Sequence, residues 1–216
     1  MECFSSDWRF LDRWSDFEGL KIKKFMLLQI VLRGISGVGK TTLRRLLTAA
    51  FLQKGYKVII ECKDEIRKEV ERSRGTTYSY TPEEEQMVSY LYSSRIHALL
   101  HPFNPDGPFS NAIVICDNTH VNLKQLRESQ FCIPENDPVT YKRALIEVGS
   151  YDSLSSKSSI YPNIIGRQRV QWVDSSVPLH NWCQVHFVPQ FWLGDHSAIE
   201  DGISDIVEGL LDIKNK

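Results

Sequence analysis

The chain has 216 residues, of which 42% are hydrophobic and 25% are charged, and its formal net charge is −1. This length suits one α/β domain with a sizeable core and is too short for two ordinary domains. The near-neutral charge argues against a strongly basic scaffold that coats duplex nucleic acid, although it allows a local basic groove for a short single strand. No apolar run is long enough to span a bilayer, and the five cysteines form no C-x-x-C pair. We therefore expect a reduced, cytoplasmic protein without a membrane segment or structural zinc.

Residues 1–24 form an aromatic leader. Phe4, Trp8 and Leu11 lie at helical spacing, which predicts a short amphipathic helix docked on the main domain. A surface for a partner or for a homo-oligomer is the alternative, because the same aromatic face would serve either purpose. The predicted organisation is therefore a leader over 1–24 and one domain over 25–216.

The segment from Gly34 to Thr41 fits the phosphate-binding pattern G-x-x-x-x-G-K-[ST] at every fixed position. A mainly apolar strand is predicted before it over 26–33, and a helix after it over 42–52. Glycines allow successive N–H groups to face phosphate oxygens, and the helix N-terminus adds its positive dipole end. We expect Lys40 to reach the β- and γ-phosphates of ATP and the Thr41 hydroxyl to ligate Mg²⁺. The expected nucleotide-binding residues are Gly34, Ile35, Ser36, Gly37, Val38, Gly39, Lys40, Thr41 and Thr42.

Further strands and helices alternate along the rest of the chain. Patterns of apolar residues and turn signals predict strands over 57–62, 112–116, 141–148 and 183–188. Helices are predicted from about Lys63, from Thr81-Pro82 to about Leu100, and over 122–130, 164–172 and 199–213. This alternation predicts a parallel sheet with helices on both faces, which is the α/β class of a kinase-like P-loop NTPase.

Two further strand ends carry groups suited to phosphoryl transfer. Asp117 ends the apolar strand from residue 112, where an acid can hold Mg²⁺ directly or through water; the alternative is a helix N-cap. Asp64 is the expected general base for an attacking hydroxyl, again with a cap as the alternative. Arg67 lies one helical turn later and is expected to bind a phosphate of the acceptor, unless it is a solvated residue paired with an acid.

The phosphate loop, Lys63-Asp64-Glu65-Ile66-Arg67 and the segment from Val114 to Asn122 follow one another in an order that resembles the 5′-kinase domain of bacteriophage polynucleotide kinase and related small P-loop kinases. The resemblance covers residues 26 to 125. It implies that Asp64 is the general base and that Arg67 binds the substrate phosphate.

The predicted lid, around 150–161, departs from that family. The family's lid offers arginines that clamp the transferring phosphate, whereas Ser150 to Ser159 contains only Lys157 as a basic residue. Lys157 therefore replaces the clamp, or Arg167 or Arg169 of the following helix swings in, or transfer is slow. A lost arginine finger costs about 10³–10⁵-fold in well-studied phosphoryl-transfer systems.

These observations predict an ATP- and Mg²⁺-dependent kinase whose acceptor is the 5′-hydroxyl of an RNA or DNA end. The alternatives are a kinase for a nucleoside, nucleotide or other small metabolite, and a nucleotide-switched accessory ATPase that resembles the P-loop partners of tRNA-modification machinery. In that last case the aromatic leader would be a docking element.

Overall fold

The computed structural model of the protein describes residues 27–100, 112–130, 142–149, 162–174, 184–188 and 196–212. The aromatic leader and the predicted lid with Lys157 lie outside these residues. The predicted division at residue 24 therefore stays a prediction.

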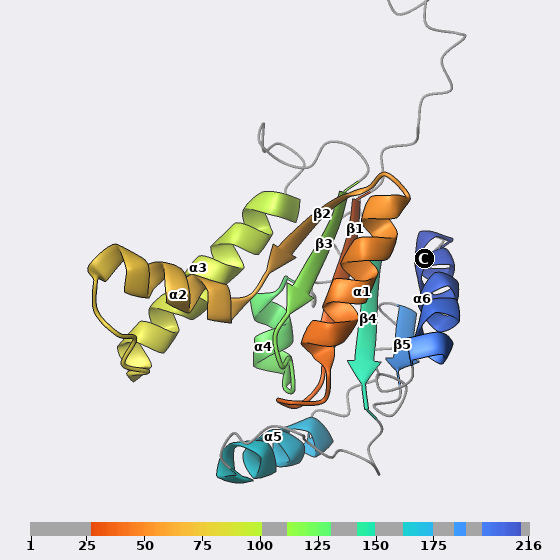
Figure 1. The fold of residues 1–216 in the computed structure, drawn as a ribbon. Helices are drawn as coiled ribbons and strands as arrows, with labels where there is room; N and C mark the ends of the chain where they lie inside the picture. Colours follow the sequence, from red (N-terminus) through yellow and green to blue (C-terminus); the bar gives the residue numbers. More distant parts are fainter. Residues whose placement is uncertain are drawn as a thin grey trace, which may run out of the picture.

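A five-stranded parallel sheet forms the centre of the described structure, in the order β2-β3-β1-β4-β5 (Figure 1). Its strands are β1 (Leu27–Arg33), β2 (Lys57–Glu61), β3 (Ala112–Asp117), β4 (Lys142–Val148) and β5 (Gln184–Val188). The register pairs Leu32 of β1 with Asp117 of β3 and with Ile146 of β4, so these strands end at a common edge. The predicted parallel sheet is thereby confirmed.

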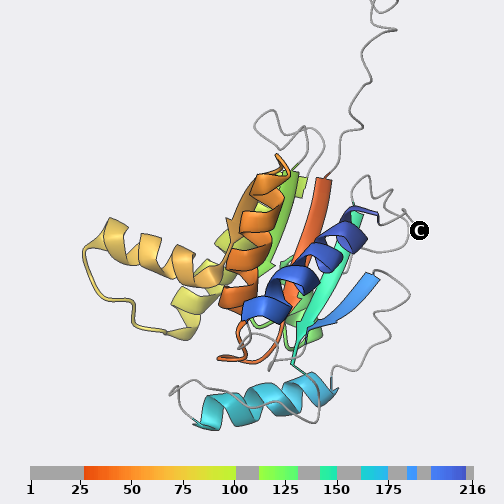
Figure 2. The same cartoon turned by 45° about the vertical axis from the view of Figure 1, so that its right-hand side comes forward.

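Helices cover both faces of this sheet, as Figures 1 and 2 show. They are α1 (Lys40–Gln53), α2 (Lys63–Arg74), α3 (Pro82–Leu100), α4 (Leu123–Glu128), α5 (Pro162–Asp174) and α6 (His196–Leu211). α1 and α6 pack on one face, while α2, α3 and α4 contribute to the core on the other face. α5 lies across the end of the sheet at which the strands terminate.

The two faces bury separate apolar clusters. Leu28, Ile30 and Leu32 of β1 face α1 and α6, whereas Val31 faces the α3 side. This alternation follows from the two-residue period of a strand, and burial on both faces explains why β1 and β3 are apolar throughout most of their length. The central strand is consequently held from both sides directly before the phosphate loop.

Local sequence signals mark the starts of α3 and α4. Glu84 N donates to Thr81 Oγ1 before α3 (3.2 Å), and Gln125 N donates to the Asn122 side chain at the start of α4 (2.9 Å). Other helix bounds differ by two or three residues from their predictions: α1 begins two residues before its predicted start, α4 ends two residues before its predicted end, and α5 extends two residues beyond its predicted range at each end. α6 differs from its prediction, because it begins at His196, three residues before the predicted start, and ends at Leu211. The apolar spacing marks only the packed part of this helix and says nothing of its first turn. Within the described residues, no helix combines the length and apolar character needed to cross a bilayer.

Candidate active site

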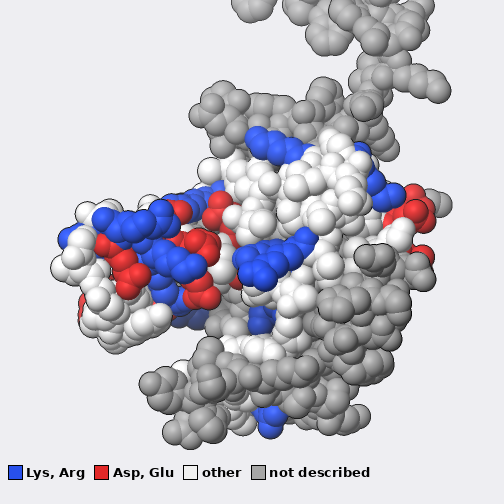
Figure 3. Space-filling model, in the orientation of Figure 1, with Lys and Arg blue, Asp and Glu red and all other residues white. Residues whose placement is uncertain are grey.

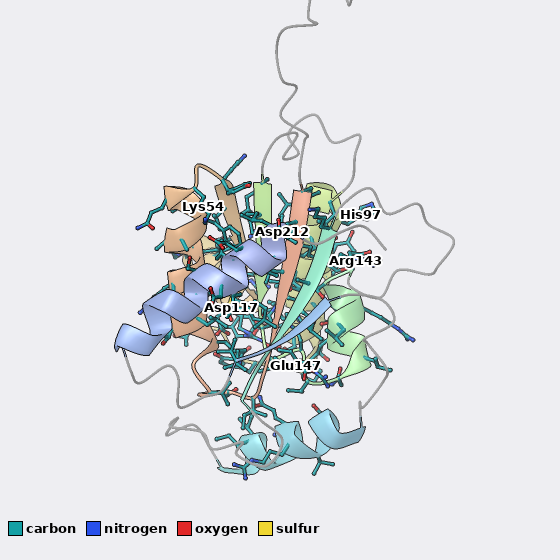
Figure 4. The ribbon with its side chains drawn as sticks, turned by 90° about the vertical axis from the view of Figure 1, so that its right-hand side faces the viewer. Lys54, His97, Asp117, Arg143, Glu147 and Asp212 are labelled. Carbon is teal, nitrogen blue, oxygen red and sulfur yellow. The ribbon has the colours of Figure 1, made fainter. Side chains whose placement is uncertain are left out.

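The three sequence motifs meet around one cavity of about 720 Å³ at the carboxyl edge of the sheet. In Figure 4, Asp117 and Glu147 lie toward the end that faces α5, whereas Lys54, His97, Arg143 and Asp212 lie toward the opposite end. Ligands of parallel α/β sheets bind at the carboxyl ends of the strands. The predicted site residues that line the cavity are Ser36, Gly37, Lys40, Thr41, Asp64, Arg67 and Asp117. Gln168 of α5 also lines it and was not predicted.

The phosphate loop requires glycine for two different reasons. Gly39 precedes α1 with φ 103°, a left-handed conformation that strains other residues. Gly34 is required by space, because a Cβ there would lie 2.9 Å from Val38 Cγ2 and 3.1 Å from the Val148 carbonyl oxygen. Gly34 N also donates to the Thr119 carbonyl (2.9 Å), which ties the loop to the end of β3.

Lys40 lies inside the loop and is only 8% exposed. Its Nζ donates to the carbonyl oxygens of Gly34 (2.8 Å) and Ile35 (2.7 Å). Burial lowers the pKa of Lys40 to about 8, although the negative charges of Asp117 and Asp64 oppose this shift. The amine is therefore poised to gain charge stabilisation from a phosphate.

Asp117 is buried and forms an ion pair with Arg44 of α1 (Arg44 Nη1 to Asp117 Oδ2, 2.9 Å). Burial raises the pKa of Asp117, while Arg44 and Lys40 oppose that rise. The N-cap interpretation of Asp117 is wrong, because Asn122 caps α4. Arg44 was missed from the sequence; its position one turn after Lys40 was the available signal, since i and i+4 share a helix face.

The donors beside the loop suit a nucleotide with its metal ion. Thr41 offers an exposed hydroxyl and Asp117 a carboxylate, and hard oxygen donors of this kind are what Mg²⁺ prefers. Arg44 Nε and Asn118 Nδ2 are buried donors of cavity-lining residues that have no hydrogen-bond partner among the described residues. Buried donors without a partner suit phosphate oxygens. The residues present therefore fit both the phosphates of a nucleotide and its Mg²⁺ ion.

Asp64 and Arg67 lie together in the first turns of α2. The Asp64 side chain is 73% exposed and pairs with Arg67, which also makes two hydrogen bonds of 2.8 Å to Glu85 of α3. Burial alone would lower the pKa of Arg67, but Glu85 and Asp64 outweigh it and raise that pKa. Asp64 is not the helix cap, because Cys62 occupies that position. Arg67 is paired with acids, but its side chain is only 18% exposed and so is not the solvated residue of the alternative interpretation; it lines the cavity.

α5 contacts the phosphate loop through a neutral side chain. Ser36 N donates to Gln168 Oε1 (2.8 Å), and Gln168 Nε2 donates to Ser36 Oγ (3.1 Å). Arg167 and Arg169, the predicted lid candidates on this helix, are exposed and do not line the cavity. The two arginines suggested a basic contact with the phosphates, and nothing in the sequence indicated that Gln168 between them would contact Ser36 instead.

A buried histidine connects the loop strand with β3 and α3. His120 is 1% exposed; its Nδ1 lies 2.7 Å from the Leu32 carbonyl oxygen, and its Nε2 lies 3.3 Å from the Tyr92 hydroxyl. Burial lowers the pKa of His120 to about 3, so this ring is neutral at physiological pH. Its neutral form donates from Nδ1 and accepts at Nε2, which satisfies both contacts.

Comparisons with known proteins bear on the fold. No protein-family model and no curated protein sequence matches the chain. Among solved structures, Kti12 of Chaetomium thermophilum in complex with ADP-AlF3 is similar with a TM-score of 0.53 at 14% identity, over 84% of this chain and 98% of that one. APE1195 gives 0.49 at 18% identity, over 88% and 98% of the two chains. The APS kinase CysC of Mycobacterium tuberculosis gives 0.42 at 12% identity, over 69% and 96%.

The similarity to Kti12 concerns the fold alone, because the sequence identity is low. It agrees with the strand order and the phosphate loop described above. The chain therefore has the predicted α/β fold of the kinase-like P-loop NTPases.

Proposed function

We propose that the protein is an ATP- and Mg²⁺-dependent phosphotransferase that acts on a hydroxyl group, and that its acceptor is the 5′-hydroxyl of a polynucleotide end. One observation carries the proposal. Lys40, Asp64 and Asp117, from three separate motifs, line one cavity closely enough for each acid to influence the pKa of the lysine. A phosphate-binding cation, a candidate base and a candidate metal ligand within one cavity are the parts that phosphoryl transfer needs.

The proposed reaction assigns a step to each group. Loop amides and Lys40 hold the β- and γ-phosphates, and Asp64 accepts the proton of the acceptor hydroxyl. The resulting oxygen forms a bond to the γ-phosphorus while the bond from phosphorus to the β,γ-bridging oxygen breaks, and ADP leaves with that oxygen. Thr41 and Asp117 would hold Mg²⁺, which neutralises charge on the phosphates when bound. Asp117 can serve in this way once its carboxylate is shared with, or released from, Arg44.

Replacement of the candidate base tests this assignment. Asp64→Asn should leave the affinity for ATP near that of the wild type while the rate of transfer falls about 10²–10⁴-fold, because the amide cannot accept the proton. Binding is measured by calorimetry and transfer with γ-labelled ATP and a 5′-hydroxyl oligonucleotide. Glu83→Gln, at an exposed position of α3 that does not line the cavity, is the matched control and should transfer at the wild-type rate. Equal rates for wild type and Asp64→Asn would remove Asp64 from the mechanism.

The polynucleotide acceptor rests on the resemblance to phage polynucleotide kinase and on the chemistry of the cavity wall. Figure 3 shows basic side chains over α1 and α2, with acidic side chains among those of α2. Arg44, Arg45 and Lys68 are among the basic residues that line the cavity. Labelled ATP offered to 5′-hydroxyl oligonucleotides beside a panel of nucleosides and nucleotides separates a polynucleotide kinase from a small-metabolite kinase.

A nucleotide-switched accessory ATPase is the second candidate, and the contact between Ser36 and Gln168 favours it. This contact joins the phosphate loop to α5, so a nucleotide that displaces Gln168 would change the position of a helix with exposed arginines. The presence of ADP-AlF3 on Kti12 is compatible with either candidate. Hydrolysis of ATP that tRNA stimulates without labelling any acceptor would support the switch and contradict the kinase.

A further inference from the structure

One aromatic side chain at the cavity is not accounted for by the phosphotransfer groups. Tyr80 lines the cavity and is 68% exposed, although an exposed tyrosine by itself needs no explanation. Its ring meets the buried Tyr78 edge-on, with centroids 4.8 Å apart and an interplanar angle of 87°. The guanidinium carbon of Arg67 lies 5.7 Å from the Tyr80 centroid and 6.0 Å from that of Tyr78. We call these three residues the aromatic shelf.

The shelf is held in place by contacts beneath it. The Tyr78 hydroxyl donates to Glu85 (3.0 Å), the same carboxylate that holds Arg67. Tyr80 has a φ of 55°, a left-handed conformation that is unfavourable for a bulky residue. An aromatic side chain is therefore exposed to solvent at a position whose backbone conformation is unfavourable for a bulky residue. Such outliers gather at ligand sites.

The shelf is joined directly to the candidate base. Arg67 lies between Tyr80 and Asp64, because it contacts the aromatic ring and pairs with the carboxylate. A base stacked on Tyr80 would therefore lie near a hydroxyl that reaches Asp64. The shelf belongs to the α2–α3 side of the cavity, whereas the donor phosphates are assigned to the loop at the start of α1.

We propose that the aromatic shelf stacks the nucleobase of the terminal nucleotide whose 5′-hydroxyl is presented to Asp64. This inference rests on the proposed phosphotransferase function and specifies its acceptor as one that carries a base. Stacking on an aromatic face accepts every base, and an arginine beside the ring adds a cation–π contribution. The shelf therefore selects for a nucleic-acid end without selecting its sequence. The adenine of the donor is the other possible source of a base, and the experiment separates the two.

The test uses the full chain with a non-hydrolysable ATP analogue, Mg²⁺ and a 5′-hydroxyl oligonucleotide that carries 2-aminopurine at its 5′ end. Wild-type protein should quench the fluorescence of this base, because stacking on an aromatic ring quenches it. Tyr80→Ala should abolish the quenching and weaken oligonucleotide binding about 5- to 150-fold, while Tyr80→Phe retains both. Affinity for the ATP analogue alone should be the same in all three proteins.

A control variant and three contradicting outcomes accompany this test. Tyr90→Ala removes a tyrosine that is 71% exposed and does not line the cavity, so it should bind and quench like the wild type. If the wild type binds the ATP analogue but does not quench 2-aminopurine, the stacking proposal is wrong and the proposed phosphotransferase function is unaffected. The same holds if Tyr80→Ala binds the oligonucleotide as tightly as the wild type. A loss of affinity for the ATP analogue in Tyr80→Ala overturns the stacking proposal as well, because the base would then be the donor adenine. Failure of the wild type to bind any nucleotide overturns the proposed function itself.

Discussion

Individual charges around the cavity are arranged in pairs, with Lys40 as the contrasting case. Arg44 neutralises Asp117, and Arg67 is shared between Glu85 and Asp64. Lys40 instead donates to two backbone carbonyls, and its pKa is lowered to about 8 by burial. The amine therefore has the most to gain when a phosphate enters, since a bound anion favours its charged form.

The lowered pKa of Lys40 makes nucleotide affinity depend on pH. Below pH 8 the amine is charged in the free protein, and above pH 8 it must take up a proton to bind phosphate. Affinity should therefore fall about tenfold between pH 7 and pH 9, since a group with a pKa of about 8 loses most of its charge over this range. Calorimetry in buffers of different ionisation enthalpy measures both the affinity and the proton uptake. Lys40→Arg stays charged throughout and is the control; a wild-type affinity that is flat with pH would contradict the prediction.

Burial of His120 predicts a loss of stability in acid. Its pKa is about 3 in the folded protein and 6.5 in the unfolded chain, so the unfolded chain binds the proton more readily between these values. The free energy of unfolding therefore falls as the pH drops below 6.5, by about 2 kcal/mol at pH 5. Urea unfolding at pH 7 and pH 5 measures this difference. His120→Asn tolerates the φ of 47° at this position and should lose less stability between the two pH values.

At the scale of elements, α5 is attached to the site by side chains of the loop and of α4. Gln168 makes two hydrogen bonds to Ser36, and Asn122 Nδ2 donates to Gln171 Oε1 (3.4 Å). Ile165 packs against the cluster formed by the sheet with α1 and α6. The hydrogen bonds of Gln168 and Gln171 therefore contribute to the orientation of α5 over the phosphate loop.

Removal of the Gln168 contact should loosen α5 without unfolding the sheet. Gln168→Leu loses two hydrogen bonds of about 0.5–1.5 kcal/mol each, so the amides of α5 should exchange about 5- to 150-fold faster. Hydrogen–deuterium exchange measured by mass spectrometry follows the α5 and β1 peptides in the same sample. Arg167→Ala, at an exposed position of the same helix, should leave the exchange unchanged. Unchanged α5 exchange in Gln168→Leu would show that the contact between Gln168 and Ser36 does not hold the helix in place.

Sequence patterns predicted the elements well and the contacts between them poorly. The phosphate loop, the strand ending at Asp117 and the helix start at Thr81-Pro82 each follow from local rules of glycine, burial and capping. Arg44 and Gln168 escaped prediction because their partners lie far away in the chain. Arg44 and Asp117, for example, are brought together only when β3 pairs with β1. Local periodicity contains no information on such pairings.

For the whole molecule, the site is assembled from elements that surround the central strand. β1 has β3 and β4 as neighbours, and the cavity takes residues from the loop after β1, from α2, from the end of β3 and from α5. A nucleotide that binds there should stabilise the entire fold, because it binds only the assembled site.

Nucleotide binding should consequently raise the unfolding temperature. At a concentration of ATP one hundred times its dissociation constant, the stabilisation is about 2.7 kcal/mol. For a chain of this size, this corresponds to an increase of about 5 to 10 °C. Scanning fluorimetry with Mg²⁺ and increasing ATP measures it, and Lys40→Ala should show little shift. If the unfolding temperature of the wild-type protein does not change with the concentration of ATP, nucleotide binding at this loop is contradicted.

The position of β1 between β3 and β4 has a consequence for the protein while it is synthesised on the ribosome. β1 leaves the ribosome before its neighbour β4, because Lys142 follows its partner Leu28 by 114 residues. At about 5–20 residues per second, the intervening segment takes roughly 5 to 20 seconds to synthesise. During that interval the edge of β1 that pairs with β4 has no partner strand, and a polypeptide that ends before Lys142 would lack the strand on that side of β1.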